Sequence, residues 1–212
     1  MKIGKKVAII LCNGEPPYKY QLSEYLDRTG LFIAADGGGN VALEFKLEPD
    51  VIIGDLDSFS KINEVKCPVI KNPDQNTNDL EKALAYALQM QSTSAIVFGA
   101  TGRRVDQTVK NLSVMKQFND QFDNLIFKDR YSDIKLIASP HSETLPLNTS
   151  VSLFPLSGTV SGVSSKGLKY QLQNDTLENG VFDGSSNETI EPVVEITYKS
   201  GDLLLFINHN ID

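Results

Sequence analysis

The chain has 212 residues, of which 41% are hydrophobic and 22% charged, and its formal net charge is −7. This length suits one large domain or two modest ones, and the composition is that of an ordinary globular protein with a substantial core. The acidic balance argues against a nucleic acid partner, because affinity for a phosphate backbone rests mostly on lysine and arginine. An anionic ligand would need a metal ion or a few local basic groups.

The N-terminal segment contains one apolar run, Val7–Cys12. The run is too short for the hydrophobic core of a secretory signal and far too short to span a membrane. The cysteines, Cys12 and Cys67, lie inside apolar runs without metal-binding spacing, so we expect buried free thiols. These features predict a cytoplasmic protein with no membrane partner.

Short apolar runs alternate with helical patterns from about Lys6 to Ser139. The runs expected to form strands are residues 7–12, 31–36, 51–55, 68–72, 95–99, 125–129 and 134–139. Between the fourth and the fifth run, apolar residues recur from Leu80 to Leu88 at the spacing of one helix face. Continuous apolar strands separated by amphipathic helices are what a parallel sheet covered on both faces requires. The pattern predicts a Rossmann-like α/β domain.

The pattern changes after Ser139. The remaining sequence is rich in Gly, Ser, Thr and Val, with short alternating runs, turn signals and no helical period. Such a pattern predicts a small β-sandwich or barrel. We place the boundary within residues 138–148 and expect an α/β domain at residues 1–140 and an all-β sandwich domain at residues 141–212.

Polar residues follow four of the expected strands. They are Asp36; Asp55 and Asp57; Asp74 and Asp79; and Thr101, Arg104 and Asp106. Ligands of open α/β sheets bind beyond the carboxyl ends of the strands, so these groups should converge. Several carboxylates beside a glycine-rich turn suit Mg²⁺, and the metal in turn lets an acidic site hold a nucleotide. The set predicts phosphoryl or nucleotidyl chemistry.

Each motif also has an ordinary structural explanation. Asp36 and the glycines after it could form a turn in which a glycine takes a positive φ. Asp55 and Asp57 could be solvated loop acids or cap a helix together with Ser58, and Asp79 would suit the dipole of the helix that follows it. The pair Arg103-Arg104 at another helix start opposes the dipole, which favours an anionic ligand there.

Competing motifs fit less well. The run "GATGRR" lacks the last glycine of a dinucleotide fingerprint and follows a late strand, and the chain contains no G-x-x-x-x-G-K-[ST] loop. A metal-dependent nucleotidyl or sugar transferase remains an alternative, because Asp-x-Asp also occurs in enzymes of that kind.

Four motifs occur in a characteristic order: "AADGGGN", "PDVIIGDLDS", "PDQNTNDLEKAL" and "GATGRRVDQTVKNL", followed by "GLKYQL" and "GSSNE". The set closely resembles the thiamine pyrophosphokinase family over roughly residues 34–206. The resemblance implies an enzyme, a thiamine diphosphokinase, that uses Mg²⁺ and moves the diphosphoryl group of ATP to the hydroxyethyl oxygen of thiamine, giving thiamine diphosphate and AMP. It also implies a homodimer with active sites at the interface. A non-catalytic nucleotide- or thiamine-binding regulator on the same fold is a second alternative.

The resemblance implies roles for individual residues. It assigns Asp36, Asp55, Asp57 and Asp79 to the metal; Asp36, Gly37, Thr101, Arg104 and Asp106 to ATP; and Gln75, Ser186 and Asn187 to thiamine. Asp57, Asp79 and Arg104 are expected to be catalytic, and either Asp57 or Asp79 would orient the hydroxyl group or accept its proton.

Two positions differ from the pattern of many bacterial members of the family. Gln107 stands where they have histidine, as it does in eukaryotic members. Arg103 stands where they have a second glycine, and it adds bulk and charge beside the expected phosphates.

Overall fold

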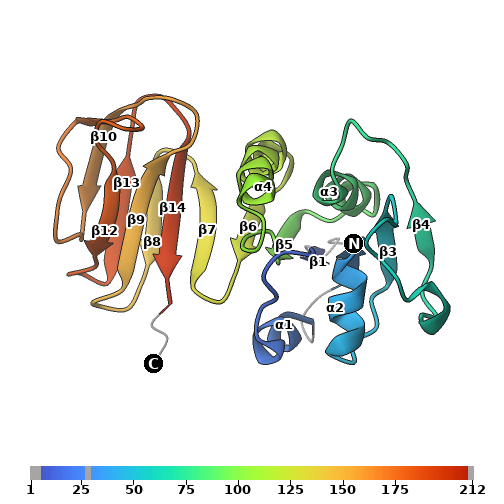
Figure 1. Cartoon of the computed structure of the whole chain (residues 1–212). Helices are drawn as coiled ribbons and strands as arrows, with labels where there is room; N and C mark the ends of the chain where they lie inside the picture. Colours follow the sequence, from blue (N-terminus) through green and yellow to red (C-terminus); the bar gives the residue numbers. More distant parts are fainter. Residues whose placement is uncertain (1–5, 27–29, 210–212) are drawn as a thin grey trace, which may run out of the picture. The chain divides into compact units, whose positions relative to one another are not determined.

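The computed structural model describes residues 6–26 and 30–209 of the chain. It divides into two compact units, Met1–Arg130 and Tyr131–Asp212. The described part of the first unit combines strands with helices, and that of the second consists of strands and connecting loops (Figure 1).

The first unit is built on a parallel sheet. Its strands are β1 (Val7–Leu11), β2 (Leu31–Ala35), β3 (Val51–Gly54), β4 (Val69–Lys71), β5 (Ser94–Phe98) and β6 (Asn124–Lys128). They lie in the spatial order β6-β5-β1-β2-β3-β4, and every neighbouring pair is parallel. The chain therefore builds outward from β1 in one direction and then returns to build from its other side. Such a switch point, here between β1 and β5, is where open α/β sheets bind ligands.

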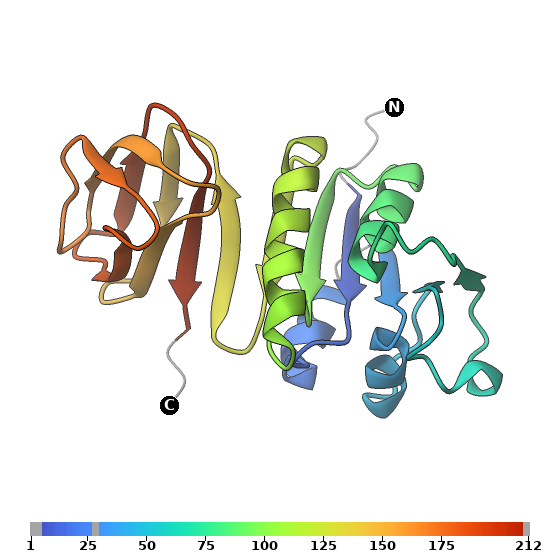
Figure 2. The same cartoon turned by 45° about the horizontal axis from the view of Figure 1, so that its top comes forward.

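Helices cover both faces of this sheet. They are α1 (Lys19–Leu26), α2 (Gly38–Glu44), α3 (Asp79–Gln89) and α4 (Val105–Phe118), with short 3₁₀ turns at Ile62–Glu64 and Asn119–Gln121. Helices α3 and α4 lie over one face and α1 and α2 over the other (Figures 1 and 2). Ile9 and Phe98 pack against Leu22 of α1 and Val41 of α2. Because both faces are covered, the central strands are apolar at nearly every position.

The second unit contains two antiparallel sheets. Its strands are β7 (Ser132–Ile137), β8 (His141–Thr144), β9 (Ser150–Pro155), β10 (Val160–Lys166), β11 (Asp175–Leu177), β12 (Gly184–Glu188), β13 (Val193–Thr197) and β14 (Leu203–Asn208). One sheet has the order β12-β9-β14-β7 and the other β11-β10-β13-β8. Leu153 and Leu205 of the first sheet share a buried core with Val163 and Ile196 of the second. Alternating patterns such as that of β13 place every second side chain in this core.

The broad expectation of an α/β region with a large sheet, followed by an antiparallel all-β region, is confirmed. The last strand expected for the α/β region differs in its partner. Strand β7 pairs antiparallel with β14, with Ile134 opposite Phe206, and is counted with the second unit. The expected helix at residues 80–88 is confirmed by α3.

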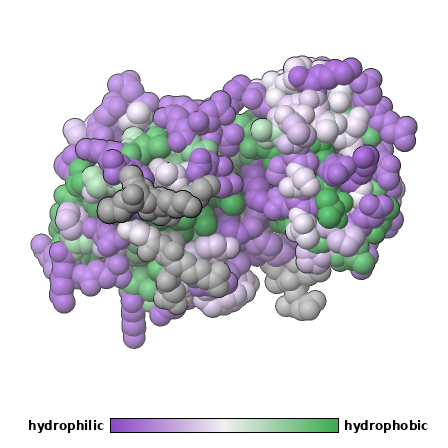
Figure 3. Space-filling view, turned by 180° about the vertical axis from the view of Figure 1, so that it is seen from behind, coloured by the Kyte–Doolittle hydropathy of each residue, from purple (hydrophilic) through white to green (hydrophobic). Residues whose placement is uncertain are grey.

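Polar side chains occupy much of the protein surface. Figure 3 shows one face, seen from behind, on which hydrophilic residues predominate and smaller hydrophobic patches lie between them. The cysteines are free, with Cys12 buried and Cys67 partly buried. Across residues 6–26 and 30–209, every helix is too short or too polar to cross a membrane.

Candidate functional site

A cavity of about 360 Å³ lies at the carboxyl edge of the parallel sheet. Its walls come from the loops that follow β1, β2, β3 and β5, and from the first turns of α3 and α4. Polar side chains that line it include those of Asn13, Asp36, Asp57, Asp79, Arg103 and Arg104. The cavity therefore occupies the switch point of the sheet and gathers side chains from segments far apart in the sequence.

Backbone hydrogen bonds join the loop after β1 to the loop after β5 beside the cavity. The N–H of Gly14 donates to the carbonyl of Gly99 at 2.8 Å, and the N–H of Glu15 donates to that of Thr101 at 2.7 Å. Gly99 has a φ of +67°, and a Cβ at this position would lie 2.5 Å from the carbonyl oxygen of Cys12. Only glycine satisfies both conditions without strain, so the close approach of the loops depends on it.

Asp36 occupies an unusual backbone position directly after β2. Its φ is +43°, it is only 3% exposed, and its carboxylate accepts hydrogen bonds from the N–H groups of Ser58 at 3.1 Å and Phe59 at 3.3 Å. The expectation that a glycine supplies the positive φ of this turn is wrong, because Gly37 has a φ of −59°. Gly37 instead leaves room for Asn13, whose Nδ2 would lie 2.3 Å from an added Cβ.

Gly54, the last residue of β3, lies between two of the carboxylates. A Cβ on Gly54 would lie 2.6 Å from the Cβ of Asp36 and 3.0 Å from Oδ1 of Asp79. Asp79 is the first residue of α3, whose start is fixed by a capping box between Asn78 and Glu81. The strand end and the helix start can therefore approach each other only because residue 54 has no side chain.

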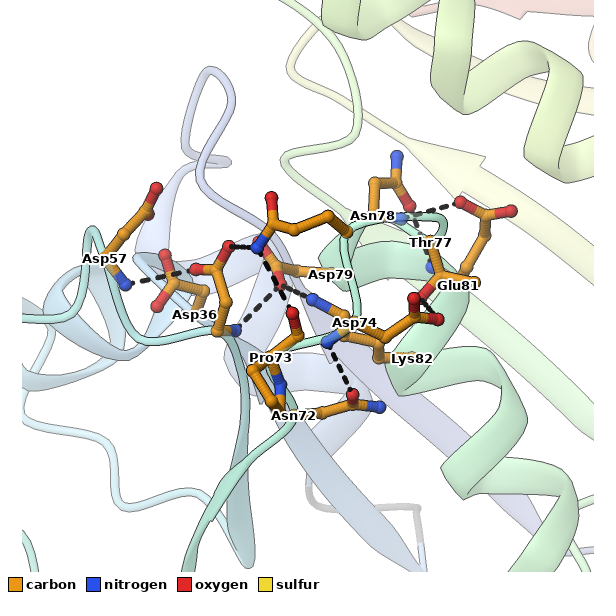
Figure 4. Close-up of polar contacts among 12 residues, drawn as sticks. Asp36, Asp57, Asn72, Pro73, Asp74, Thr77, Asn78, Asp79, Glu81 and Lys82 are labelled. Carbon is orange, nitrogen blue, oxygen red and sulfur yellow. Dashed lines mark hydrogen bonds and ion pairs between the residues drawn. The ribbon is translucent and has the colours of Figure 1, made fainter.

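Three carboxylates converge at this point. Asp36, Asp55 and Asp79 each offer an oxygen, and these oxygens lie within 4.8 Å of one another. Asp36 and Asp79 are labelled in Figure 4. The pKa of Asp36 is raised, mainly by burial and also by the charge of Asp79. The pKa of Asp55 is lowered, mainly by a hydrogen bond from the N–H of Asp57. Carboxylate oxygens at this spacing are the hard ligands that Mg²⁺ prefers, so the residues fit a divalent cation.

Asp57 and Gln75 lie at the rim of this cluster. Asp57 lines the cavity outside the group of three, donates its N–H to Oδ1 of Asp55 at 3.1 Å and accepts a hydrogen bond from Oγ of Ser58 at 2.8 Å. Gln75 donates from Nε2 to Oδ2 of Asp55 at 3.3 Å. Asp74 is committed to its own loop, where it accepts hydrogen bonds from Asn76 and Thr77.

The arginines border the cavity at the start of α4. Arg104 directly precedes α4, and its Nε donates to Oδ1 of Asp106 at 3.1 Å. This exposed pair raises the pKa of Arg104 and lowers that of Asp106. Arg103 has a φ of +53° and donates from Nη1 to the backbone oxygen of Asn13 at 3.2 Å and to its Oδ1 at 3.1 Å. Arg103 thus ties the loop after β5 to the loop after β1.

Three of the expected ATP residues, Gly37, Thr101 and Asp106, lie beside the cavity and are not among its lining residues. Thr101 donates its hydroxyl to Oδ2 of Asp129 at 2.9 Å. The side chain of Asp106 is held by Arg104. Their expected roles in binding ATP stay predictions.

The sequence reasoning missed a buried asparagine that connects two walls of the cavity. Asn111, inside α4, donates from Nδ2 to the carbonyl of Ala100 at 2.7 Å and accepts from Nδ2 of Asn78 at 2.9 Å. It therefore holds the loop after β5 against the start of α3. Asparagine is unfavourable inside a helix, and this was the one signal that could have identified it.

The expected thiamine residues of the second unit lie on β12. Asn187 is buried; its Nδ2 donates to the carbonyl of Tyr170 at 2.7 Å, and its Oδ1 accepts from the N–H of Tyr170 at 3.0 Å. Ser186 is exposed, has a φ of +57°, and donates its N–H to Oγ of Ser152 at 3.0 Å. Asn187 thus fixes the Tyr170 segment, and Ser186 presents its side chain to solvent.

The fold and the site together define a class of protein. The chain is an α/β protein with a cavity, a carboxylate cluster and two arginines at the switch point of its parallel sheet. Such a site is equipped to bind an anionic ligand together with a divalent cation.

Comparison with known proteins identifies the family within this class. The family pattern described as "Thiamin pyrophosphokinase, catalytic domain" matches residues 22–127, and "Thiamin pyrophosphokinase, vitamin B1 binding domain" matches residues 137–203. The chain belongs to the thiamine pyrophosphokinase family, and the resemblance seen in the sequence motifs is confirmed.

Individual relatives agree with this assignment. The chain is 29% identical to thiamin pyrophosphokinase 1 of Caenorhabditis elegans, over 93% of this chain and 86% of the relative. It is 27% identical to thiamine pyrophosphokinase 1 of Oryza sativa subsp. japonica, over 86% and 80% respectively. The crystal structure of thiamine pyrophosphokinase from Bacillus subtilis shares the fold, with a TM-score of 0.85, 22% identity, and coverage of 97% of this chain and 100% of that one.

Proposed function

We propose that the chain transfers the diphosphoryl group of ATP to the hydroxyethyl oxygen of thiamine, giving thiamine diphosphate and AMP. One observation carries this proposal. Asp36, Asp55 and Asp79 converge beside a cavity at the switch point of the sheet, in a chain that matches both domains of the family. The first unit supplies the charged groups that phosphoryl chemistry needs, and the family match names the acceptor.

The cavity of the first unit is the proposed ATP site. Asp36, Asp55 and Asp79 would hold Mg²⁺, with Asp57 as a further candidate at the rim. A bound Mg²⁺ supplies positive charge against the charge of the phosphates. Arg104, Thr101, Gly37 and Asp106 are the proposed nucleotide residues beside it, and Arg104 can leave its exposed pairing with Asp106 to meet a phosphate.

In the proposed reaction the hydroxyl oxygen of thiamine attacks the β-phosphorus of ATP. A bond forms between that oxygen and the β-phosphorus, and the bond from the β-phosphorus to the oxygen bridging it to the α-phosphorus breaks, so that AMP leaves. Asp57 is the preferred acceptor for the hydroxyl proton, because Asp79 already binds Lys82 and the N–H of Asp55. Arg104 would stabilise the charge that develops on the transferred group.

The proposed thiamine residues are Gln75 at the rim of the cluster and Ser186 and Asn187 on β12. Carboxylates beside the cavity would also suit the positively charged thiazolium ring. We further propose that residues 1–140 form a Rossmann-like domain that binds ATP and that residues 141–212 form a β-sandwich domain that binds thiamine. We also propose that the protein is a cytoplasmic homodimer with active sites at its interface.

The identity of the released nucleotide tests the reaction. The protein is incubated with thiamine, ATP and Mg²⁺, and nucleotides are separated by ion-exchange chromatography, with thiamine omitted in one control and Mg²⁺ chelated in another. Thiamine-dependent release of AMP supports the proposal. Release of ADP would indicate a monophosphoryl kinase, and release of inorganic diphosphate a nucleotidyl transferase. Binding of either substrate without turnover would indicate a regulator.

A further inference from the structure

Lys82 is a buried cation next to the carboxylate cluster. It lies on α3 three residues after Asp79, and its side chain is only 2% exposed. Its Nζ lies 3.1 Å from Oδ1 of Asp79, one of the three clustered carboxylates (Figure 4). Lysine is rarely this buried unless its charge is compensated, so this ion pair requires an explanation.

Lys82 influences the cluster beyond its direct partner. Its positive charge contributes to lowering the pKa of Asp55 and that of the nearby Asp74. The charge of Asp79 acts in the opposite direction on its neighbours, because it helps to raise the pKa of Asp36 and, together with burial, that of Cys12 to about 12. Lys82 is not among the residues that line the cavity, so a ligand in the cavity would meet Asp36 and Asp79 and not the ammonium group.

We propose that Lys82 is the internal counter-cation of the carboxylate cluster: it holds Asp79 toward Asp36 and Asp55 and competes with an incoming divalent cation for Asp79. Lys82 is then a positioning residue and not a catalytic one. The inference rests on the proposed function only in naming that cation as the Mg²⁺ of the reaction.

The physical reason is the repulsion among the carboxylates. Three carboxylate oxygens within 4.8 Å of one another repel strongly, and without compensation they would separate or take up protons. One ammonium group offsets one of the three charges, so the cluster is held together in the folded protein. The same compensation weakens the attraction for a bare divalent cation. Affinity would rise when phosphate oxygens join the site.

Binding of Mn²⁺ without ATP or thiamine tests this inference. Free Mn²⁺ is measured by electron paramagnetic resonance in titrations of wild type, Lys82→Met, and the control Lys110→Met. Lys110 of α4 pairs with the buried Glu81 of α3, the helix that carries Lys82, at 3.0 Å, and Glu81 lies outside the three-carboxylate group. We expect Lys82→Met to bind Mn²⁺ about tenfold more tightly, because one positive charge near the ion is removed. Lys110→Met should bind as wild type does.

The double variant Asp79→Asn with Lys82→Met isolates the pair. If the two residues act together, Lys82→Met changes the Mn²⁺ affinity by less than about twofold when Asp79 carries no charge. Unchanged or weaker binding by Lys82→Met in the wild-type background would overturn the proposal.

Stability measurements address the case in which Lys82→Met folds poorly. Lys82→Gln is the second variant, and thermal unfolding of both is followed with and without Mn²⁺. A loss of stability that Mn²⁺ restores supports the counter-cation role. A loss that Mn²⁺ leaves unchanged contradicts it, because Lys82 would then act through packing alone.

The inference and the proposed reaction fail in distinguishable ways. Tighter Mn²⁺ binding by Lys82→Met with no thiamine-dependent AMP from wild type would contradict the reaction alone. AMP release by wild type with unchanged Mn²⁺ affinity of Lys82→Met would contradict the inference alone.

Discussion

The carboxyl edge of the first unit and strand β12 of the second use polar side chains for opposite purposes. At the edge, Asp36, Asp55 and Asp79 are held together against their mutual repulsion, and Asp36 takes a left-handed backbone conformation as well. On β12, the amide of Asn187 satisfies the backbone of Tyr170 and removes a cost of burial. The hydrogen bonds of Asn187 therefore favour folding. The convergence of the three carboxylates instead costs folding free energy. Concentrated charge that folding does not require is therefore the better indicator of function.

Removal of one clustered charge should have the largest effect. We expect Asp79→Asn to lower turnover by about 10²–10³-fold, because it weakens the proposed Mg²⁺ site for the reacting phosphates. Asp74→Asn is the matched control, since Asp74 lies outside the three-carboxylate group and is bonded within its own loop. The measurement is the rate of thiamine-dependent AMP release at saturating Mg²⁺. Equal losses of turnover in Asp79→Asn and Asp74→Asn would contradict a special role of the carboxylate cluster.

Asp57→Asn tests whether Asp57, at the rim, has a different role from the three clustered carboxylates. If Asp57 accepts the proton, turnover should fall by about 10²-fold while Mn²⁺ binding without nucleotide changes little. Both quantities are measured on the same preparation. Wild-type turnover in Asp57→Asn would show that Asp57 has no part in the catalytic site, and a large loss of Mn²⁺ affinity would make it a metal ligand instead.

Gly54→Ala tests whether the carboxylates can converge only because residue 54 has no side chain. The new Cβ would meet the Cβ of Asp36 and Oδ1 of Asp79, so the carboxylates must move apart. We expect turnover to fall by about tenfold or more, with a loss of about 1–3 kcal/mol in the free energy of unfolding. Gly180→Ala is the control for a surface glycine, because an added Cβ there meets nothing within 4 Å, and it should lower stability through its φ of +79° without a change in turnover.

Asn187→Ala examines the second unit. Loss of its hydrogen bonds frees the Tyr170 segment and leaves backbone groups unsatisfied, which should cost about 1–3 kcal/mol of stability. If this segment forms part of the thiamine site, the KM for thiamine rises about tenfold and that for ATP stays the same. Steady-state kinetics with each substrate varied in turn provides the readout. A thiamine KM equal to that of wild type would remove the support for a vitamin contact here.

The smallest effect concerns pH and lies within the second unit. Hydrogen bonds from His141 and from Lys135 lower the pKa of Glu143 to about 2. A carboxyl whose pKa is lowered by folding stabilises the protein above its unfolded pKa, and this contribution is lost as pH falls from about 4.5 toward 2. Urea unfolding should therefore show wild type more stable than Glu143→Gln by about 1–2 kcal/mol at pH 5, with the gap closing by pH 2 to 3. A gap independent of pH would contradict the ion-pair explanation.

Much of the first unit could be predicted because the relevant signals are local. Continuous apolar runs formed β1 to β6, and the period from Leu80 to Leu88 formed α3. Polar residues after successive parallel strands met at one edge, because parallel strands all end on the same side. The run at 134–139 was identified as a strand, but its antiparallel partner β14 lies about 70 residues later in the chain and left no signal nearby.

The sequence by itself determined the strands, the helix carrying Asp79, the set of acidic groups at the sheet edge and the family. Tertiary structure alone decided that Asp36, Asp55 and Asp79 share one point while Asp57 stays at the rim, and that Gly54 and Lys82 make this possible. Local sequence sets backbone direction and side-chain type. Distances between carboxylates on different loops depend on strand order and on the packing of α3 against the sheet, which a linear pattern does not contain.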